Sequence, residues 1–148
     1  RYWLIVYDKQ TNETKKLIKF FEKLGSIVEI VNTEYHDRIL AITSHLPHLI
    51  DYTIFGTASD LESDLKNDVI KYSASGFRDF TRIASSDPIM WRDVFLKNSD
   101  AVLEMIQRFN EDLSDLQKAI RKKDGDKLHS FFSRTRSIRK KIIDAGQI

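Results

Sequence analysis

The sequence predicts a mainly α-helical protein that begins with a short β-α-β segment. Only 5 glycines and 2 prolines occur among the 148 residues, which favours long helices joined by few turns. From Thr33 onward the apolar residues recur at helical spacing in every segment. Before Thr33, two short runs rich in β-branched and aromatic residues flank one amphipathic stretch, which is the pattern of two strands and a helix.

Composition and charge narrow the class of protein. An apolar fraction of 41% and a charged fraction of 31% are typical of a soluble globular chain. No run approaches the roughly 20 apolar residues of a membrane span, no secretory signal is visible, and there is no cysteine for a disulfide or a thiolate metal site. We therefore expect a cytoplasmic protein with neither a membrane nor a nucleic-acid partner, since a net charge of +2 is too small to attract a polyanion.

Residues 1–32 carry the β-α-β pattern. The expected elements are strands over 2–7 and 26–31 and a helix that runs from Thr11 or Asn12 to Gly25. This order has the right-handed crossover format of a parallel sheet. Because two parallel strands do not form an independent sheet, we interpret residues 1–32 as the last part of a larger α/β domain. A small two-stranded appendage packed on the helices is the alternative.

Residues 33–148 are predicted to be helical. The expected helices run from Thr33, as the N-cap, to about Leu61, from 77 to 84, from Pro88 to about Lys123, and from a break at 124–126 onward, with a loop over 63–67. Ser86 or Asp87 would cap the third helix, and Pro88 suits its first position. Pro47 lies inside the first helix and should kink it between His45 and His48, because proline has no backbone N–H.

The third helix carries a heptad seam. Its apolar residues are spaced four, three, four, three and four apart, at Val102, Ile106, Phe109, Leu113, Leu116 and Ile120. Such a seam predicts a long helical partner, whereas a core helix of a monomer is the alternative. The last helix is expected to bury Leu128, Phe131 or Phe132, Thr135, Ile138 and Ile142.

A histidine-rich stretch in the first helix is the main functional signal. Residues 35–49 hold His36, His45 and His48, three of the four histidines of the chain. At about 100° of rotation per residue, a narrow polar stripe runs along an otherwise apolar helix. The stripe consists of Asp37, Ala41, Ser44 and His48, with His45 beside it. A stripe of short polar side chains and imidazoles suggests the lining of a ligand site.

Three interpretations of these histidines stay open. A metal site would need further ligands such as Asp37 and Asp51, but Pro47 disturbs the turn that would set the spacing, and the HExxH pattern is absent. Buried histidines bonded to backbone carbonyls are the purely structural alternative. The pattern favours the third interpretation, in which the imidazoles bind an anionic or hydroxylated ligand and no metal.

Arg82 is a second candidate for anion binding. It lies among apolar residues, and a half-buried guanidinium is suited to hold a carboxylate through two hydrogen bonds. A solvated pair with Asp79 is the alternative. The small residues 73–76 just before this helix could bring backbone N–H groups close to the same anion. Trp91 could cover a ligand ring, although a lone aromatic residue is more often part of the core.

Two long motifs resemble a known family. They are His36-Asp37-Arg38 with Ser44-His45-Leu46-Pro47-His48, and Gly76-Phe77-Arg78-Asp79-Phe80-Thr81-Arg82-Ile83-Ala84 with Ser86-Asp87-Pro88-Ile89-Met90-Trp91-Arg92-Asp93. Both are similar to the prephenate dehydrogenase family, and the nearest group is the bacterial cyclohexadienyl dehydrogenases, which act on prephenate or arogenate in tyrosine biosynthesis. The resemblance covers nearly the whole chain.

The resemblance implies a fold and an activity. It implies a two-domain enzyme like 6-phosphogluconate dehydrogenase, in which a Rossmann domain binds NAD or NADP and a helical domain binds substrate and forms a homodimer. Residues 1–32 would then be the C-terminal remnant of the nucleotide-binding domain, and residues 33–148 the substrate-binding and dimerisation domain. The implied reaction is the oxidative decarboxylation of prephenate to 4-hydroxyphenylpyruvate, or of arogenate to tyrosine. The cofactor fingerprint GxGxxG and the family's catalytic histidine are not in this sequence, so we expect the chain alone to be inactive.

The resemblance also implies roles for individual residues. His48 matches the substrate-binding histidine, Arg82 matches the arginine that engages a substrate carboxylate, and Asp79 matches an acidic residue of the ionic network around it. The implied substrate-binding set is Ser44, His45, His48, Ser75, Gly76 and Arg82, and the supporting or gating set is Asp37, Asp79 and Trp91. Ser75 replaces a glycine that is common in some branches, which leaves open whether tyrosine acts as a feedback inhibitor.

A non-catalytic function is the alternative to this reading. The chain would then be a helical dimer whose basic last helix contacts nucleic acid or an acidic partner. This alternative depends on Arg134, Arg136, Arg139, Lys140 and Lys141. A solvated helix face explains the same charges, and the net charge of +2 argues against nucleic acid.

Overall fold

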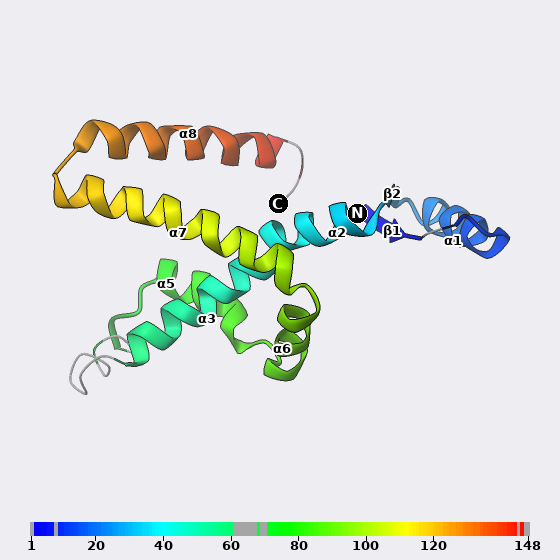
Figure 1. Ribbon diagram of the computed structural model, residues 1–148, viewed down its shortest axis with the longest axis horizontal. Helices are drawn as coiled ribbons and strands as arrows, with labels where there is room; N and C mark the ends of the chain where they lie inside the picture. The colour runs from blue at the N-terminus through cyan, green and yellow to red at the C-terminus, as the bar shows by residue number, and fades with distance from the viewer. Residues whose placement is uncertain (1, 8, 61–67, 69–70, 145, 147–148) are drawn as a thin grey trace. The chain divides into compact units, whose positions relative to one another are not determined.

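The computed structural model describes residues 2–7, 9–60, 68, 71–144 and 146 (Figure 1). The loop predicted over 63–67 lies outside the described residues. The chain forms two compact units, Arg1–Met105 and Ile106–Ile148. The first unit contains the β-α-β segment and most of the helices. No helix in the described part of the chain is long and apolar enough to cross a membrane.

The β-α-β segment forms as predicted. Strands β1 (Tyr2–Val6) and β2 (Ile27–Val31) pair in parallel, with Tyr2 opposite Ile27 and Val6 opposite Val31. Helix α1 (Asn12–Lys23) begins where the Thr11 hydroxyl accepts the Thr14 N–H at 3.2 Å, and Gly25 follows its end with a positive φ of 77°. Trp3 stacks on Phe21 with ring centroids 3.9 Å apart, which attaches the helix to the sheet.

The first predicted helix consists of three pieces. They are α2 (Thr33–Leu40), a π-helical turn η1 (Ala41–His45), and α3 (Leu46–Ser59). The N-cap is Asn32, one residue earlier than predicted, and its side chain accepts the Tyr35 N–H at 2.7 Å.

The irregularity of this helix precedes Pro47. The Leu46 N–H donates to the Ala41 carbonyl, which is the wide spacing of a π-turn. The predicted kink between His45 and His48 is therefore wrong in position, because the backbone widens in the turn before the proline. Proline has no N–H for the Thr43 carbonyl and its ring crowds that oxygen, and the wider turn relieves both problems. The Thr43 hydroxyl donates to the Ile39 carbonyl at 2.6 Å, a bond that often accompanies a bent helix.

The next predicted helix is also divided. It is observed as α5 (Ser75–Phe80) followed by a 3₁₀ segment η2 (Thr81–Ser85). Phe77 on α5 stacks on Phe55 of α3 at 6.3 Å, and η2 packs against α3. The Tyr52 hydroxyl on α3 donates to the Ser86 carbonyl at 2.7 Å, which fixes the end of η2.

The single helix predicted from Pro88 to Lys123 is wrong. The structure has α6 (Pro88–Lys97) and α7 (Ser99–Arg121), which are separated by Asn98 with φ −112° and ψ 34°. The start of α6 is as predicted, with Pro88 at the first helical positions and the Asp87 carboxylate accepting two backbone N–H groups, at 2.8 and 3.0 Å.

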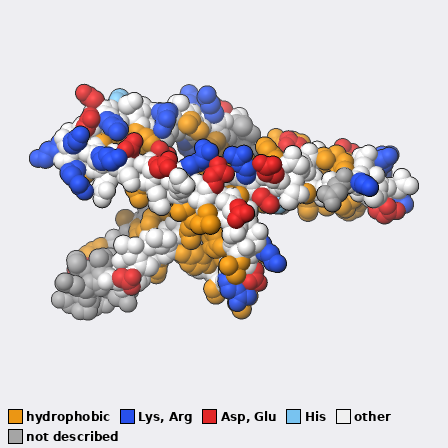
Figure 2. Space-filling model, in the orientation of Figure 1, with side chains coloured by type: hydrophobic (Ala, Val, Ile, Leu, Met, Phe, Trp, Pro, Cys, Tyr) orange, Lys and Arg blue, Asp and Glu red, His pale blue; other side chains and the backbone are white. Residues whose placement is uncertain are grey.

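The second unit contains the end of α7 and α8 (Gly125–Asp144). Lys123, at φ 54°, reverses the chain, and the Asp124 N–H donates to the Ala119 carbonyl at 2.9 Å. Of the residues expected to be buried on the last helix, only Leu128 and Phe131 are half-buried. The others are exposed, namely Phe132, Thr135, Ile138 and Ile142. On α8 the Lys and Arg side chains lie between Asp126 and Asp144 with no acidic residue among them, and in Figure 2 Lys and Arg gather at the end where α7 meets α8.

The core of the first unit lies where α3, α6 and α7 contribute buried side chains. Its buried apolar residues are Ala41, Leu46, Trp91, Val102 and Met105. His45 and Asp51 are buried among them although both are polar. This core therefore includes the histidine-rich stretch.

We expect Asn32→Ala to lower the free energy of unfolding by about 1 kcal/mol, because the first turn of α2 loses its side-chain cap. Asn32→Ser, which keeps an acceptor oxygen, is expected to stay within about half of that loss. Urea unfolding of both variants would measure the difference. Equal stability of Asn32→Ala and the unsubstituted protein would contradict the capping role.

Candidate functional site

The candidate site is a cluster of two imidazoles around one indole. The His48 ring stacks on Trp91 with ring centroids 3.6 Å apart and an interplanar angle of 25°. His45 approaches the same indole edge-on, at 6.1 Å and 77°. Trp91 is 7% exposed and His45 is 8% exposed, while His48 is half-buried. The start of α6 at Pro88 places Trp91 in the first turn of that helix, where it faces both histidines.

His48 is oriented by its own helix. Its Nδ1 lies 2.8 Å from the Ser44 carbonyl oxygen, one turn earlier. A carbonyl oxygen only accepts hydrogen bonds, so Nδ1 must carry a proton. When the ring is neutral, Nε2 of His48 is consequently an acceptor. His48 therefore donates a hydrogen bond through Nε2 only when its ring is protonated.

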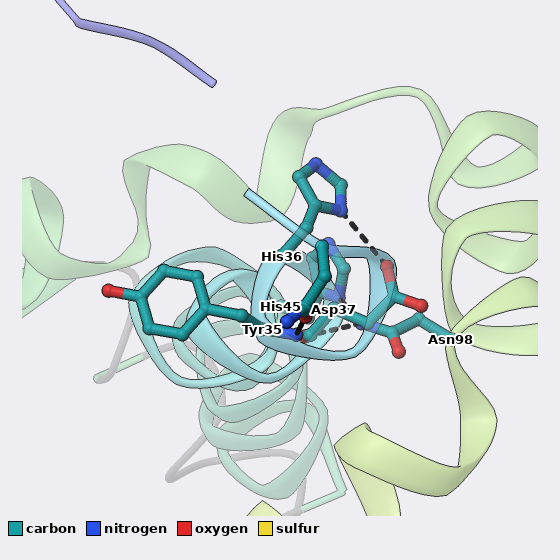
Figure 3. A network of polar contacts seen from close by, with 6 residues as sticks. Tyr35, His36, Asp37, His45 and Asn98 are labelled. Atoms are coloured by element: carbon teal, nitrogen blue, oxygen red, sulfur yellow. Dashed lines mark hydrogen bonds and ion pairs between the residues drawn. The ribbon is translucent and has the colours of Figure 1, made fainter. Parts of the chain in front are cut away.

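His45 is oriented by a residue far along the chain. The Asn98 side-chain nitrogen lies 3.1 Å from His45 Nδ1 and donates to the Asp37 carbonyl oxygen at 2.9 Å (Figure 3). Desolvation by burial lowers the pKa of His45 below its usual value, and the neighbouring His36 and His48 act in the same direction, whereas Asp37 opposes them. His45 is therefore held in its neutral form.

Asp37 contributes to this network through two groups. Its backbone carbonyl accepts the Asn98 amide, and its carboxylate lies 3.0 Å from Nδ1 of His36 (Figure 3). Asp37 thus lies where a residue supporting the histidines would lie.

Two buried polar groups near the cluster have no partner in the described part of the chain. Asp51 is 0% exposed, and neither of its carboxylate oxygens has a hydrogen-bond partner there. The indole N–H of Trp91 is likewise unpaired. Asp51 lies one turn after His48 and was considered as a possible metal ligand. Among the described residues, however, no three His, Asp or Glu side chains lie close enough together to hold a metal ion.

The remaining predicted residues lie at the surface. Arg82 is exposed on η2, the segment that packs against the histidine-bearing helix α3. Ser75 and Gly76 begin α5 and are exposed, as is Asp79 near its end. The structure thus brings His45, His48, Trp91 and the Ser44 carbonyl together, and it does not place the exposed set in contact with them.

Asn98 is the site residue that the sequence reasoning missed. A signal for it does exist, because Asn98-Ser99-Asp100 is a typical helix start with an N-cap residue and an acidic first turn. The strong helical periodicity on both sides of Asn98 concealed this signal.

The chain was compared with known proteins. The family model described as "Prephenate dehydrogenase, dimerization domain" matches residues 32–134. The cyclohexadienyl dehydrogenase of Zymomonas mobilis is 39% identical over 120 residues, which are 81% of this chain and 41% of that protein. The prephenate dehydrogenase of Bacillus subtilis is 32% identical over 133 residues, or 89% of this chain and 35% of that protein.

Solved structures are similar as well. The structure described as prephenate dehydrogenase from A. aeolicus in complex with hydroxyphenyl propionate and NAD+ matches with a TM-score of 0.82 and 33% identity, over 94% of this chain and 50% of that one. The Synechocystis arogenate dehydrogenase shares the fold, with a TM-score of 0.84 and 22% identity. The chain therefore spans between 35% and 51% of the length of these relatives.

The lowered pKa of His45 predicts a pH-dependent stability. A neutral buried imidazole stabilises the fold fully above about pH 6.5, the unfolded value, and this contribution declines as the pH falls through the lower folded value. Between about pH 7 and pH 5 the unsubstituted protein should lose more stability than His45→Gln does. His129→Gln, which changes an exposed histidine on α8, is the control and should behave like the unsubstituted protein. Parallel stability curves for His45→Gln and the unsubstituted protein in urea titrations would refute this assignment.

Proposed function

Because the chain belongs to the prephenate dehydrogenase family, we propose that it is the substrate-binding and dimerisation part of an enzyme that oxidises and decarboxylates prephenate or arogenate. The observation that carries the proposal is the extent of the family match, residues 32–134. This range contains the whole histidine and indole cluster and also Arg82. In the proposed division, residues 1–32 belong to a nucleotide-binding domain and residues 33–148 form the helical domain.

The nicotinamide cofactor would be bound mainly outside this chain. A dinucleotide pyrophosphate is usually held at a glycine-rich turn between a strand and the N-terminus of the next helix. Here residues 7–11 join β1 to α1 without a glycine, so the residues present do not fit a pyrophosphate. The choice between NAD and NADP stays open, and no step of the reaction is assigned to this chain through the cofactor.

The proposed role of this chain is to bind and orient the substrate. The substrates are acids with a ring that becomes aromatic when it loses carbon dioxide and a hydride. A neutral His48 can accept a hydrogen bond from a hydroxyl at Nε2, and Arg82 can hold a carboxylate through two hydrogen bonds. The Arg82 side chain is exposed, so a ligand can reach its guanidinium. The stacked indole of Trp91 shields His48 from water on one face.

A homodimer is the second part of the proposal. In the second unit, Leu113 is 52% exposed, Ile120 is 64% exposed and Phe132 is 55% exposed, and they line a groove of about 500 Å³ between α7 and α8. The heptad seam of α7 is thus only partly covered by this chain. Exposed apolar surface of this kind is typical of an interface, and a second copy of the chain is the partner that the dimerization-domain match supports. Inhibition by tyrosine and a cytoplasmic location remain predictions.

The proposed activity can be tested in the full-length protein. His48→Ala and Arg82→Ala should each lower kcat/KM for prephenate or arogenate at least about tenfold, which corresponds to about 1.4 kcal/mol of transition-state binding. His129→Ala and Arg136→Ala remove the same side chains from exposed positions on α8 and should have little effect. Values for His48→Ala or Arg82→Ala within about threefold of the unsubstituted enzyme would show that the site is assigned wrongly.

The proposed dimer can be tested by sedimentation. The full-length protein should sediment as a dimer at micromolar concentration, and Ile120→Asp should weaken the dimer because it buries a charge in the apolar groove. Lys140→Asp, on the exposed side of α8, is the matched control. A stable monomer of the unsubstituted protein would rule out the dimer.

A further inference from the structure

We propose that Asn98 is a positioning residue that fixes His45 as the neutral tautomer with its proton on Nε2. The site would then offer a ligand one hydrogen-bond donor, on His45, and one acceptor, on His48. The assignment of the tautomer stands on geometry alone, whereas its effect on catalysis rests on the proposed function.

The contact with Asp37 identifies the Asn98 nitrogen. A side-chain amide has one accepting oxygen and one donating nitrogen. Here the atom 2.9 Å from the Asp37 carbonyl oxygen must be the nitrogen, because two oxygens would repel each other. The network itself therefore determines the orientation of the amide.

The same nitrogen then determines the tautomer of His45. It carries two hydrogens, and the one not used by Asp37 is available to His45 Nδ1 at 3.1 Å. Since this nitrogen has no accepting lone pair, Nδ1 of His45 must be the acceptor. A neutral imidazole with an accepting Nδ1 has its proton on Nε2.

His48 has the opposite arrangement. Its Nδ1 donates to the Ser44 carbonyl at 2.8 Å, which leaves a lone pair on Nε2. The two rings contact the same indole, Trp91, so the donor and the acceptor belong to one cluster. A hydroxyl group, which both donates and accepts, is the ligand group best matched to such a pair.

The position of Asn98 in the fold explains why its side chain can orient His45. It leaves the helical backbone between α6 and α7, and its carbonyl accepts the Val102 N–H at 3.1 Å as the first bond of α7. Its side chain is thus held at a helix junction by backbone bonds. The titratable groups that act on His45 are His36 and Asp37 from α2 and His48 from α3.

The tautomer can be measured directly by NMR in the full-length protein labelled with ¹⁵N-histidine. The His45 signals are identified by their loss in His45→Gln. We expect Nδ1 of His45 to show the shift of an unprotonated ring nitrogen and Nε2 that of a protonated one, with the reverse pattern for His48. A protonated Nδ1 on neutral His45 would overturn the inference, and this measurement needs no variant of Asn98.

Asn98→Asp is the sharpest variant because it keeps the shape and replaces the donor to both His45 Nδ1 and the Asp37 carbonyl with an acceptor. Neutral His45 would then place its proton on Nδ1, and Nε2 would donate only while the ring is protonated. We therefore compare kcat/KM of the unsubstituted enzyme with that of Asn98→Asp at each pH. The ratio of the two values should rise about tenfold or more from about pH 6 to about pH 9. This is the size of effect seen when a partner that orients an imidazole is removed. Asn12→Asp, the same change at an exposed position on α1, should give a constant ratio near one.

The outcomes separate this inference from the proposed function. A pH-independent ratio for Asn98→Asp overturns the positioning role, because general damage to the fold would lower activity at every pH. If the unsubstituted enzyme oxidises neither prephenate nor arogenate, the proposed function fails, and the ¹⁵N shifts still decide the tautomer.

Discussion

The π-turn Ala41–His45 is the constraint on which the site depends. An extra residue in one helical turn changes the direction of every side chain that follows, relative to those before it. Ahead of this turn, α2 presents the Asp37 carbonyl to Asn98, and at its end His45 is close enough to share the same amide. One turn later His48 lies against Trp91. In a regular helix through residues 33–59, Asp37 and His45 would not both reach Asn98 while His48 lies against Trp91. The π-turn is therefore part of the site.

The energetics of the cluster combine burial with few polar bonds. His45 and Trp91 are buried, and among the described residues the polar partner of His45 is Asn98. A buried imidazole with one polar partner has its lowest free energy in the neutral form. This agrees with the lowered pKa of His45. Asp51 differs because it is buried without any partner in the described part of the chain. Burying an unpaired polar group usually lowers the stability of the fold. Such groups are therefore found mainly where they serve a function such as binding or catalysis.

The sequence predicted those parts of the fold that depend on local signals. The β-α-β unit, the start of α6 at Asp87 and Pro88, and the gathering of histidines on one helix all follow from spacing and capping. The break at Asn98 was missed because the helical periodicity on both sides concealed its capping signal, and its contacts with Asp37 and His45 join residues distant in sequence. Burial of Ile138 was expected from periodicity, yet periodicity identifies the apolar face of a helix and not what covers it.

The stacking of His48 on Trp91 also gives the site an optical probe. The chain has two tryptophans, and the other, Trp3, lies in β1 and is 45% exposed. An indole in a dry environment emits at shorter wavelength than one in water, and a protonated imidazole in ring contact quenches its emission. The fluorescence of Trp91 should therefore change both when His48 gains a proton and when a ligand displaces water beside it. With Trp3 replaced by phenylalanine, the emission would come from Trp91 alone.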